Sequence, residues 1–211
     1  MVSKRINTKK RFIPNILTLI NMFLGFLSIG LILNDMPLKA GIFILGAALF
    51  DAFDGKIARL LGIDSKFGLE FDSMADTVSF CVVPSILIYS LYVEGLPALI
   101  GGVISFIPLM FGTIRLAKFN LSPADKNLNY FIGLPTPIAA ITLFSYLFFN
   151  NQIFGNIGDP RTALMLTFSL AVLMISPIPF AKFPLLSFHS GTKNSISLVL
   201  FFVSLLLLYF F

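Results

Sequence analysis

FIPNILTLINMFLGFLSIGLIL, residues 12–33, decides the fold class, because this run carries no charge and is long enough to cross a bilayer as one helix. A secretory signal peptide also places basic residues before an apolar run, but that run is only about 7–15 residues long and ends at a small-residue cleavage site. The run here is longer, and no such site follows it. It therefore predicts a transmembrane helix near the N-terminus.

The composition of the whole chain also indicates a membrane protein. Of its 211 residues, 57% are hydrophobic and 12% are charged, whereas roughly 25% are charged in ordinary soluble proteins. These proportions exclude a soluble globular, disordered, collagen-like or disulfide-framework protein. The single cysteine, Cys81, has no second cysteine with which to form an internal disulfide. We expect no nucleic acid partner, because no soluble basic surface is long enough to follow a phosphate backbone.

Hydrophobic runs of about 20 residues recur along the chain, separated by short connections. We predict spans at roughly 13–34, 38–60, 69–92, 96–119, 130–150, 161–179 and 194–211. Prolines make residues 175–190 irregular, so the sixth span can end early or re-enter the membrane. The predicted fold class is an all-α polytopic membrane protein, a bundle of at least six and about seven transmembrane helices. We expect residues 1–12 to form a short basic segment at the membrane interface and residues 13–211 to form one transmembrane domain.

The placement of basic residues predicts the orientation of the chain in the membrane. With a cytoplasmic N-terminus and one crossing per span, every Lys and Arg except Lys39 and Arg161 falls on the cytoplasmic side. This asymmetry follows the positive-inside rule. We therefore expect a multi-pass integral protein of the cytoplasmic membrane.

Acidic residues are concentrated where the second predicted span ends and the third begins. Asp51 and Asp54 are spaced i, i+3, and Asp72 and Asp76 are spaced i, i+4, so each pair lies on one helix face. A short loop at roughly 61–67 makes the two helices antiparallel neighbours. We expect the four carboxylates to converge just inside the cytoplasmic membrane surface. The alternative is that these acids are protonated or paired with nearby basic side chains.

Four carboxylates in one place repel one another unless positive charge lies between them. All-oxygen ligands favour Mg²⁺, Mn²⁺ or Ca²⁺ over Zn²⁺, and two such cations form a clamp suited to phosphoryl transfer. Close by, Gly55 is either a site of tight helix packing or a place where a ligand approaches the backbone. Ala58 lies on the same face, and Arg59 can bind phosphate with two parallel hydrogen bonds. Together with the acids, these residues indicate a nucleotide pocket.

The spacing of these residues resembles the signature of the CDP-alcohol phosphotransferase family. Eight positions over 26 residues match that pattern without a departure: Asp51-x-x-Asp54-Gly55-x-x-Ala58-Arg59, eight residues, Gly68, three residues, Asp72, three residues and Asp76. The resemblance implies at least six transmembrane helices around a polar cavity that opens to the cytoplasm. It also implies a CDP-linked lipid donor, two divalent metal ions (Mg²⁺ or Mn²⁺) and a homodimer.

The resemblance further implies a role for individual residues. Asp51 and Asp72 would bridge both metals, while Asp54 would bind one metal and Asp76 the other. The residues implied to line the CDP-lipid site are Asn15, Thr18, Gly55, Ala58, Arg59 and Ser65.

Three further stretches resemble the serine-using branch of the family, the CDP-diacylglycerol–serine O-phosphatidyltransferases. They are residues 14–25, 115–120 and 131–137. This branch implies a CDP-diacylglycerol or CDP-archaeol type donor and L-serine as the acceptor, with Arg115, Lys118 and Asn120 as candidate acceptor-binding residues. Lys118 departs from the family pattern, which usually has Arg there, and so loses the guanidinium fork. Asp76 is the candidate catalytic base for the serine hydroxyl, which would attack the lipid phosphate and release CMP.

Two kinds of alternative remain. Within the family, glycerol phosphate and inositol phosphate are other acceptors, but they call for a denser basic pocket than Arg115 and Lys118 suggest. From another class, a divalent-cation transporter would also place acids in its spans, although nearer the midplane and with a polar route on both sides.

Overall fold

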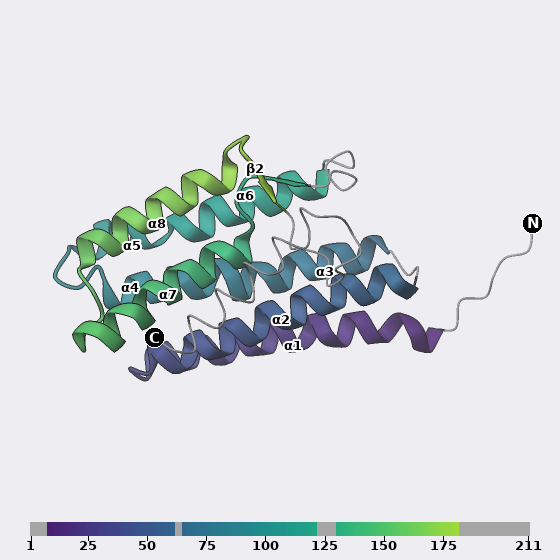
Figure 1. Cartoon of the computed structure of the whole chain (residues 1–211), viewed down its shortest axis with the longest axis horizontal. Coiled ribbons are helices and arrows are strands. Elements are labelled where there is room, and N and C mark those ends of the chain that lie inside the picture. Colours follow the sequence, from purple (N-terminus) through teal and green to yellow (C-terminus); the bar gives the residue numbers. More distant parts are fainter. Residues whose placement is uncertain (1–7, 62–64, 122–129, 182–211) are drawn as a thin grey trace, which may run out of the picture.

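A computed structural model describes residues 8–61, 65–121 and 130–181, which form a mostly helical bundle (Figure 1). In chain order the elements are α1 (Thr8–Leu33), α2 (Pro37–Leu61), α3 (Lys66–Asp76), the π-helix η1 (Thr77–Val82), α4 (Val83–Leu91), α5 (Ala98–Ser105), α6 (Ile107–Leu121), β1 (Tyr130–Ile132), α7 (Thr136–Phe154), α8 (Pro160–Ile175) and β2 (Pro179–Ala181).

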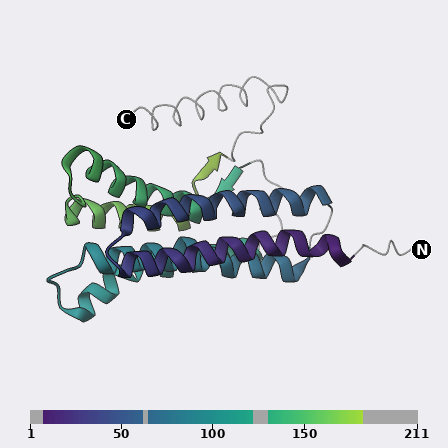
Figure 2. The ribbon, with the colours of Figure 1, turned by 90° about the horizontal axis from the view of Figure 1, so that it is seen from below.

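The helices lie side by side along the long axis of the molecule (Figures 1 and 2). α1 and α2 form a closely packed antiparallel pair, and α3, η1 and α4 follow one another as a continuous helical rod that packs against α1. α7 packs against α2, η1 and α8, while α8 also packs against α6. The acid-bearing end of α2 and the start of α3 therefore lie at the same end of the bundle, which is on the right in Figure 1.

Three helical segments in the described part of the chain are long and apolar enough to cross a membrane. They are Pro14–Leu33, Lys66–Leu91 and Ala98–Leu121, and the apolar helix Pro160–Ile175 is shorter. α2 is as long as α1 to within one residue, but it carries acidic and basic residues near its end. The prediction of a helical protein with membrane-spanning segments is confirmed in this outline, whereas the count of seven spans stays a prediction.

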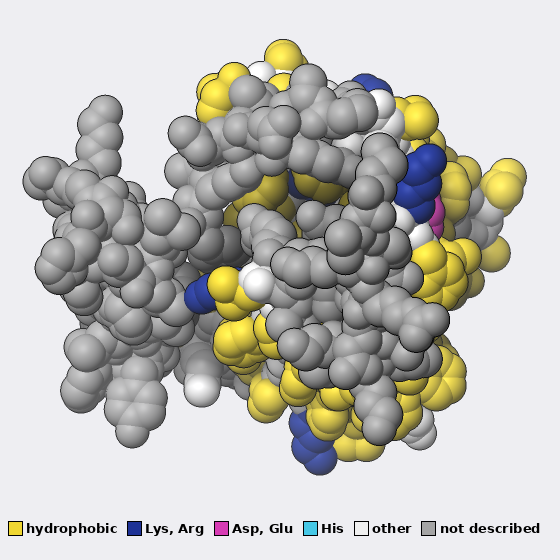
Figure 3. Space-filling view, turned by 90° about the vertical axis from the view of Figure 1, so that its right-hand side faces the viewer, with side chains coloured by type: hydrophobic (Ala, Val, Ile, Leu, Met, Phe, Trp, Pro, Cys, Tyr) yellow, Lys and Arg dark blue, Asp and Glu magenta, His cyan; other side chains and the backbone are white. Residues whose placement is uncertain are grey.

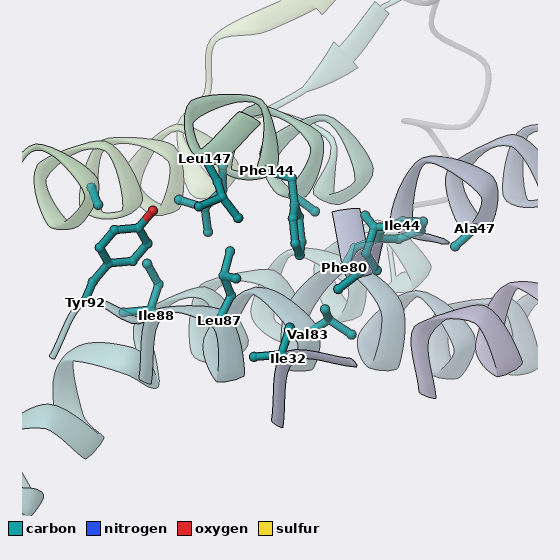
Figure 4. Packing of buried hydrophobic residues seen from close by; sticks show 14 of the residues in the cluster. Ile32, Ile44, Ala47, Phe80, Val83, Leu87, Ile88, Tyr92, Phe144 and Leu147 are labelled. Atoms are coloured by element: carbon teal, nitrogen blue, oxygen red, sulfur yellow. The ribbon is translucent and has the colours of Figure 1, made fainter. Parts of the chain in front are cut away.

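The core lies where α1, α2, η1, α4 and α7 meet (Figure 4). Phe80 and Phe144 are its largest fully buried side chains, and Ile32, Ile44 and Leu87 are likewise inaccessible. Many large apolar side chains on the outer helix faces are exposed instead, among them Phe26 at 65% and Leu99 at 81%. A soluble monomer rarely exposes apolar surface on this scale, whereas lipid-facing helices require it.

The structure corrects the predicted fifth span at its beginning. Residues 130–132 form strand β1 rather than helix, and β1 pairs antiparallel with β2 in the register Tyr130↔Ala181 to Ile132↔Pro179. The helix begins only at Thr136 because Gly133 has φ +75° and Pro135 restricts the residue before it. The sixth span ends early, at Ile175, just before Pro177. The seventh predicted span, 194–211, lies outside the described residues.

The basic N-terminal segment is described only in part. α1 begins at Thr8, so residues 8–12 belong to the same helix as the first predicted span, and no break marks the expected boundary at residue 12. Residues 1–7 of that segment lie outside the described residues.

Candidate active site

Three of the four predicted metal ligands meet in the bundle. Asp51 near the end of α2 and Asp72 and Asp76 on α3 each offer a carboxylate oxygen, and these oxygens lie within 4.8 Å of one another. Asp76 is buried, and the other two are half-buried. Asp54 is also buried, and its charge acts on Asp51 and Asp72. The spacing on two neighbouring helices thus brings the carboxylates together as the sequence predicts.

The donor atoms of this group fit a hard divalent cation. They are all carboxylate oxygens, and Asp72 Oδ1 is buried without a hydrogen-bond partner among the described residues. Among the described side chains, the guanidinium of Arg115 on α6 acts on Asp51 and Asp76, and this single positive charge does not balance four carboxylates. Ions such as Mg²⁺ and Mn²⁺ prefer oxygen ligands and would relieve this repulsion.

Two side chains of α1 hydrogen-bond to this group. Thr18 Oγ1 donates to Asp54 Oδ2 at 2.7 Å, and Asn21 Nδ2 donates to Asp76 Oδ1 at 3.2 Å. Thr18 is buried, and its hydroxyl lies closer to Asp54 Oδ2 than to the Pro14 carbonyl oxygen at 3.1 Å; a contact of Thr18 with the nucleotide stays a prediction. Asn21 had no predicted role. The signal that identifies it is an amide side chain inside an otherwise apolar span.

The other predicted nucleotide residues lie around the α2–α3 junction. Gly55 is exposed, and a Cβ added to it would meet no atom of the described residues within 4 Å, so packing against the described helices does not explain this glycine. Ser65 caps α3 by accepting a hydrogen bond from the Gly68 amide at 2.9 Å. A Cβ at Gly68 would lie 3.0 Å from Ser65 Oγ and 3.8 Å from Asn15 Oδ1, so α1 and α3 bring these polar groups close together.

Two other residues complete the predicted nucleotide set. Ala58 is half-buried on α2, on the Gly55 side of the last turns. Arg59 belongs to the same helix, but its side chain lies outside the described part of the molecule.

The predicted acceptor residues, all on α6, differ in their surroundings. Arg115 is half-buried against the acids, and its Nε is buried without a hydrogen-bond partner among the described residues. Asn120 Nδ2 lies 2.9 Å from Ser73 Oγ and 3.4 Å from Glu70 Oε2 on α3. Lys118 is exposed. The structure thus brings Arg115 and Asn120 to the acid-bearing helix and does not bury Lys118 with them.

The π-helix η1 is a feature that the sequence analysis missed. It begins directly after Asp76 and carries the buried Ser79, Phe80 and Cys81. π-Helical turns inside α-helices are rare and frequently occur at functional sites. A Cβ at Gly112 of α6 would lie 3.3 Å from Cys81 Cβ, so α6 approaches η1 closely and carries Arg115 one turn further along. Residues 77–82 contain neither proline nor glycine, so the sequence gives no local signal that predicts the π-helix.

Comparison with known proteins agrees with this site. The sequence model of the family described as CDP-alcohol phosphatidyltransferase matches residues 11–176. The CDP-diacylglycerol–serine O-phosphatidyltransferase of Helicobacter pylori is 36% identical, covering 91% of this chain and 80% of that protein. The enzyme of the same name from Bacillus subtilis is 37% identical, covering 82% of this chain and 91% of that protein.

An archaeal relative is equally similar. The archaetidylserine synthase of Methanothermobacter thermautotrophicus is 37% identical, covering 81% of this chain and 70% of that protein. The matched region of the family model includes all four acids and the whole of α1 from residue 11 onward.

Proposed function

The chain belongs to the CDP-alcohol phosphatidyltransferase family, and on that basis we propose that it transfers the phosphatidyl group of a CDP-linked lipid to the hydroxyl of L-serine. CMP is released, and the product is a phosphatidylserine-type phospholipid. The observation that carries this proposal is the convergence of Asp51, Asp72 and Asp76 in a chain whose relatives are named for serine transfer.

The four acids are the residues that would hold two divalent cations, Mg²⁺ or Mn²⁺. By position in the family pattern, Asp51, Asp54, Asp72 and Asp76 would all serve as ligands to these ions. When bound, such ions supply positive charge to the diphosphate and stabilise the charge that grows on its leaving half.

The serine hydroxyl is a poor nucleophile until a base takes its proton. Asp76 is the proposed base, because it is buried one turn further into the bundle than Asp72 and is held in place by Asn21. The serine oxygen forms a bond to the phosphorus that bears the lipid. The bond from that phosphorus to the oxygen of CMP breaks, and CMP leaves with the bonding electrons.

The nucleotide would bind where α2 and α3 meet. The open space at Gly55 admits a ligand to the helix backbone, and Ala58 keeps the neighbouring surface small. We assign Arg59 to the diphosphate. Asn15 on α1 and Ser65, the N-cap residue of α3, are the proposed polar contacts. The lipid chains stay in the bilayer, in keeping with the exposed apolar helix faces.

Serine brings a carboxylate and an ammonium group to the site. Arg115 Nε and Asn120 Oδ1 have no hydrogen-bond partner among the described residues, so the first suits the serine carboxylate and the second suits a donor such as the ammonium group. Lys118 is exposed and contributes less to such a pocket. Glycerol phosphate and inositol phosphate carry more negative charge and would need more than one buried cation, so they remain the second choice of acceptor.

We propose that the acid-bearing end of the bundle faces the cytoplasm. Figure 3 looks onto this end, and dark-blue Lys and Arg side chains stand out around its edge. Lys56, Lys66 and Lys118 are exposed there, which agrees with the positive-inside rule. A homodimer, as the family resemblance implies, is part of the same proposal.

An acceptor panel tests the function. Purified protein is given a CDP-lipid, Mn²⁺ or Mg²⁺ and one alcohol at a time, and CMP release is measured. We expect release with L-serine. Release with glycerol phosphate or inositol phosphate but not with serine would overturn the acceptor and leave the reaction class standing. Passage of divalent cations into sealed vesicles without any CMP release would favour a transporter instead.

A further inference from the structure

One face of α1 carries polar side chains toward the acids. Thr18, Asn21 and Gly25 are spaced i, i+3 and i+7, which places them on the same side of the helix. Thr18 and Asn21 are 4% and 0% exposed, although both lie within a candidate membrane span. A buried polar side chain is costly unless it has a partner, so the partners of these two residues indicate why they are there.

Each of the two side chains donates to a different carboxylate. Thr18 Oγ1 lies 2.7 Å from Asp54 Oδ2 on α2, whereas Asn21 Nδ2 lies 3.2 Å from Asp76 Oδ1 on α3. An amide nitrogen can only donate, so Asn21 is the donor to Asp76, and the Thr18 hydroxyl donates to Asp54. α1 therefore contacts acids from both of the helices that supply the proposed metal ligands.

The backbone keeps α1 close enough for these bonds. Ser79 Oγ in η1 donates to the carbonyl oxygen of Asn21 at 3.0 Å. A Cβ at Gly25 would lie only 2.9 Å from Ser79 Cα, so a side chain there would push α1 away from η1. Gly25 and Ser79 together hold α1 close to η1, and this closeness brings the amide of Asn21 within hydrogen-bond distance of Asp76.

We propose that Thr18 and Asn21 are positioning residues, which orient the carboxylates of Asp54 and Asp76 toward bound divalent cations. Partners that hydrogen-bond to metal ligands fix the orientation of those ligands, and their loss typically lowers metal affinity about 10- to 100-fold. This role rests on the proposed function only through the metal site and is independent of which lipid or alcohol reacts.

A purely structural role for the same side chains predicts a different result. Polar contacts also hold membrane helices together, so their loss would lower thermal stability and leave the metal affinity of the folded protein unchanged. Thr167 on α8 is a matched control. It is 3% exposed, and its hydroxyl donates to the Ala163 carbonyl oxygen at 2.7 Å instead of to an acid.

The test is a titration of Mn²⁺ into purified, metal-free protein in detergent, with neither substrate present. We expect Thr18→Val and Asn21→Leu to weaken Mn²⁺ binding about 10- to 100-fold. Thr18→Ser keeps the hydroxyl that donates to Asp54, and Thr167→Val removes a hydroxyl that contacts no acid. Both variants should therefore bind Mn²⁺ as the wild type does. Thr18→Ala and Asn21→Ala, which add no bulk, replace any variant that does not fold.

Two results would overturn this role. One is a folded Thr18→Val or Asn21→Leu protein whose Mn²⁺ affinity equals that of the wild type. The other is a wild-type protein that binds no Mn²⁺. If the variants bind Mn²⁺ weakly while the wild type releases CMP only with an alcohol other than serine, the positioning role stands and the proposed acceptor falls.

Discussion

At the scale of single residues, Asp76 has the most demanding assignment, because it is both a metal ligand and the base in the proposed reaction. Asp76→Asn keeps the shape of the side chain but cannot take a proton near neutral pH. General base catalysis typically contributes about 10²–10⁴-fold, so at saturating Mn²⁺ we expect kcat to fall by that range while binding of the CDP-lipid changes little. Single-turnover kinetics and a direct binding assay measure the two effects. A variant that turns over serine at the native rate would remove Asp76 as the base.

Arg115 and Lys118 allow a matched comparison of two cations on one helix. Arg115 is half-buried beside the acids and Lys118 is exposed. A hydrogen bond to a charged group contributes about 1.5–3 kcal/mol, so Arg115→Gln should raise the KM for serine by roughly 10- to 100-fold. Lys118→Gln should leave it within about twofold, as exposed ion pairs are weak. Equal effects of the two substitutions on serine KM would contradict the assignment of the serine carboxylate to Arg115.

At the scale of elements, the long apolar helices were predicted well and the irregular segments were not. The spans predicted at 38–60 and 69–92 correspond to α2 and to the rod from α3 to α4. Length and hydropathy suffice there, because a bilayer requires about 20 apolar residues whatever their neighbours are. β1 escaped prediction because its partner β2 is about 50 residues away, and a strand of three residues carries no periodic signal.

The candidate site shows the same division. Helical spacing predicted the meeting of Asp51, Asp72 and Asp76, because all three lie on regular helices joined by a short loop. The partners Thr18 and Asn21 could not be assigned in the same way. Their contacts depend on how deeply α1 packs against two other helices, and this depth is a property of tertiary packing.

The turn before α7 provides a prediction about folding stability. Gly133 has φ +75°, and a Cβ there would lie 3.0 Å from the carbonyl carbon of Met174. Gly133→Ala should therefore lower the thermal stability, since a left-handed conformation alone costs about 1–2 kcal/mol for an alanine and the backbone of α8 must also shift. Gly30→Ala is the control, because a Cβ at Gly30 meets no atom of the described part of the chain within 4 Å.

Thermal unfolding of the two variants in detergent measures the difference. Alanine favours an exposed helix over glycine by about 1 kcal/mol, so Gly30→Ala should be neutral or slightly stabilising. Equal melting temperatures for Gly133→Ala and the wild type would show that the turn tolerates a side chain and that the backbone contact with α8 is loose.

At the scale of the whole molecule, the proposed orientation can be tested with the chain's own cysteine content. Cys81 is fully buried and is the single cysteine, so one introduced thiol reports its own accessibility. Glu94 lies between α4 and α5, whereas Lys66 begins α3 at the other end of the helical rod from α3 to α4, and both native side chains are exposed. We therefore compare Glu94→Cys with Lys66→Cys. We expect a membrane-impermeant maleimide to label Glu94→Cys in intact cells and Lys66→Cys only in inside-out vesicles. The reverse pattern would contradict the positive-inside orientation.

In the proposed reaction, carboxylates from two helices bind divalent cations, and a lipid phosphoryl group is transferred to serine. The measurement is incorporation of isotope-labelled L-serine into lipid by purified protein with a CDP-lipid and Mn²⁺, followed together with CMP release. Asp72→Asn is compared with Asp35→Asn, which changes an exposed acid in the α1–α2 turn.

We expect the wild type to form one labelled lipid for each CMP released, and we expect Asp35→Asn to do the same at the same rate. A chelator should stop lipid formation and CMP release reversibly in both proteins. The transfer rate of Asp72→Asn should fall by more than the roughly 100-fold expected when a metal ligand loses its hydrogen-bond partner. Labelled phospholipid formed by Asp72→Asn at the wild-type rate in excess chelator would contradict the proposed reaction.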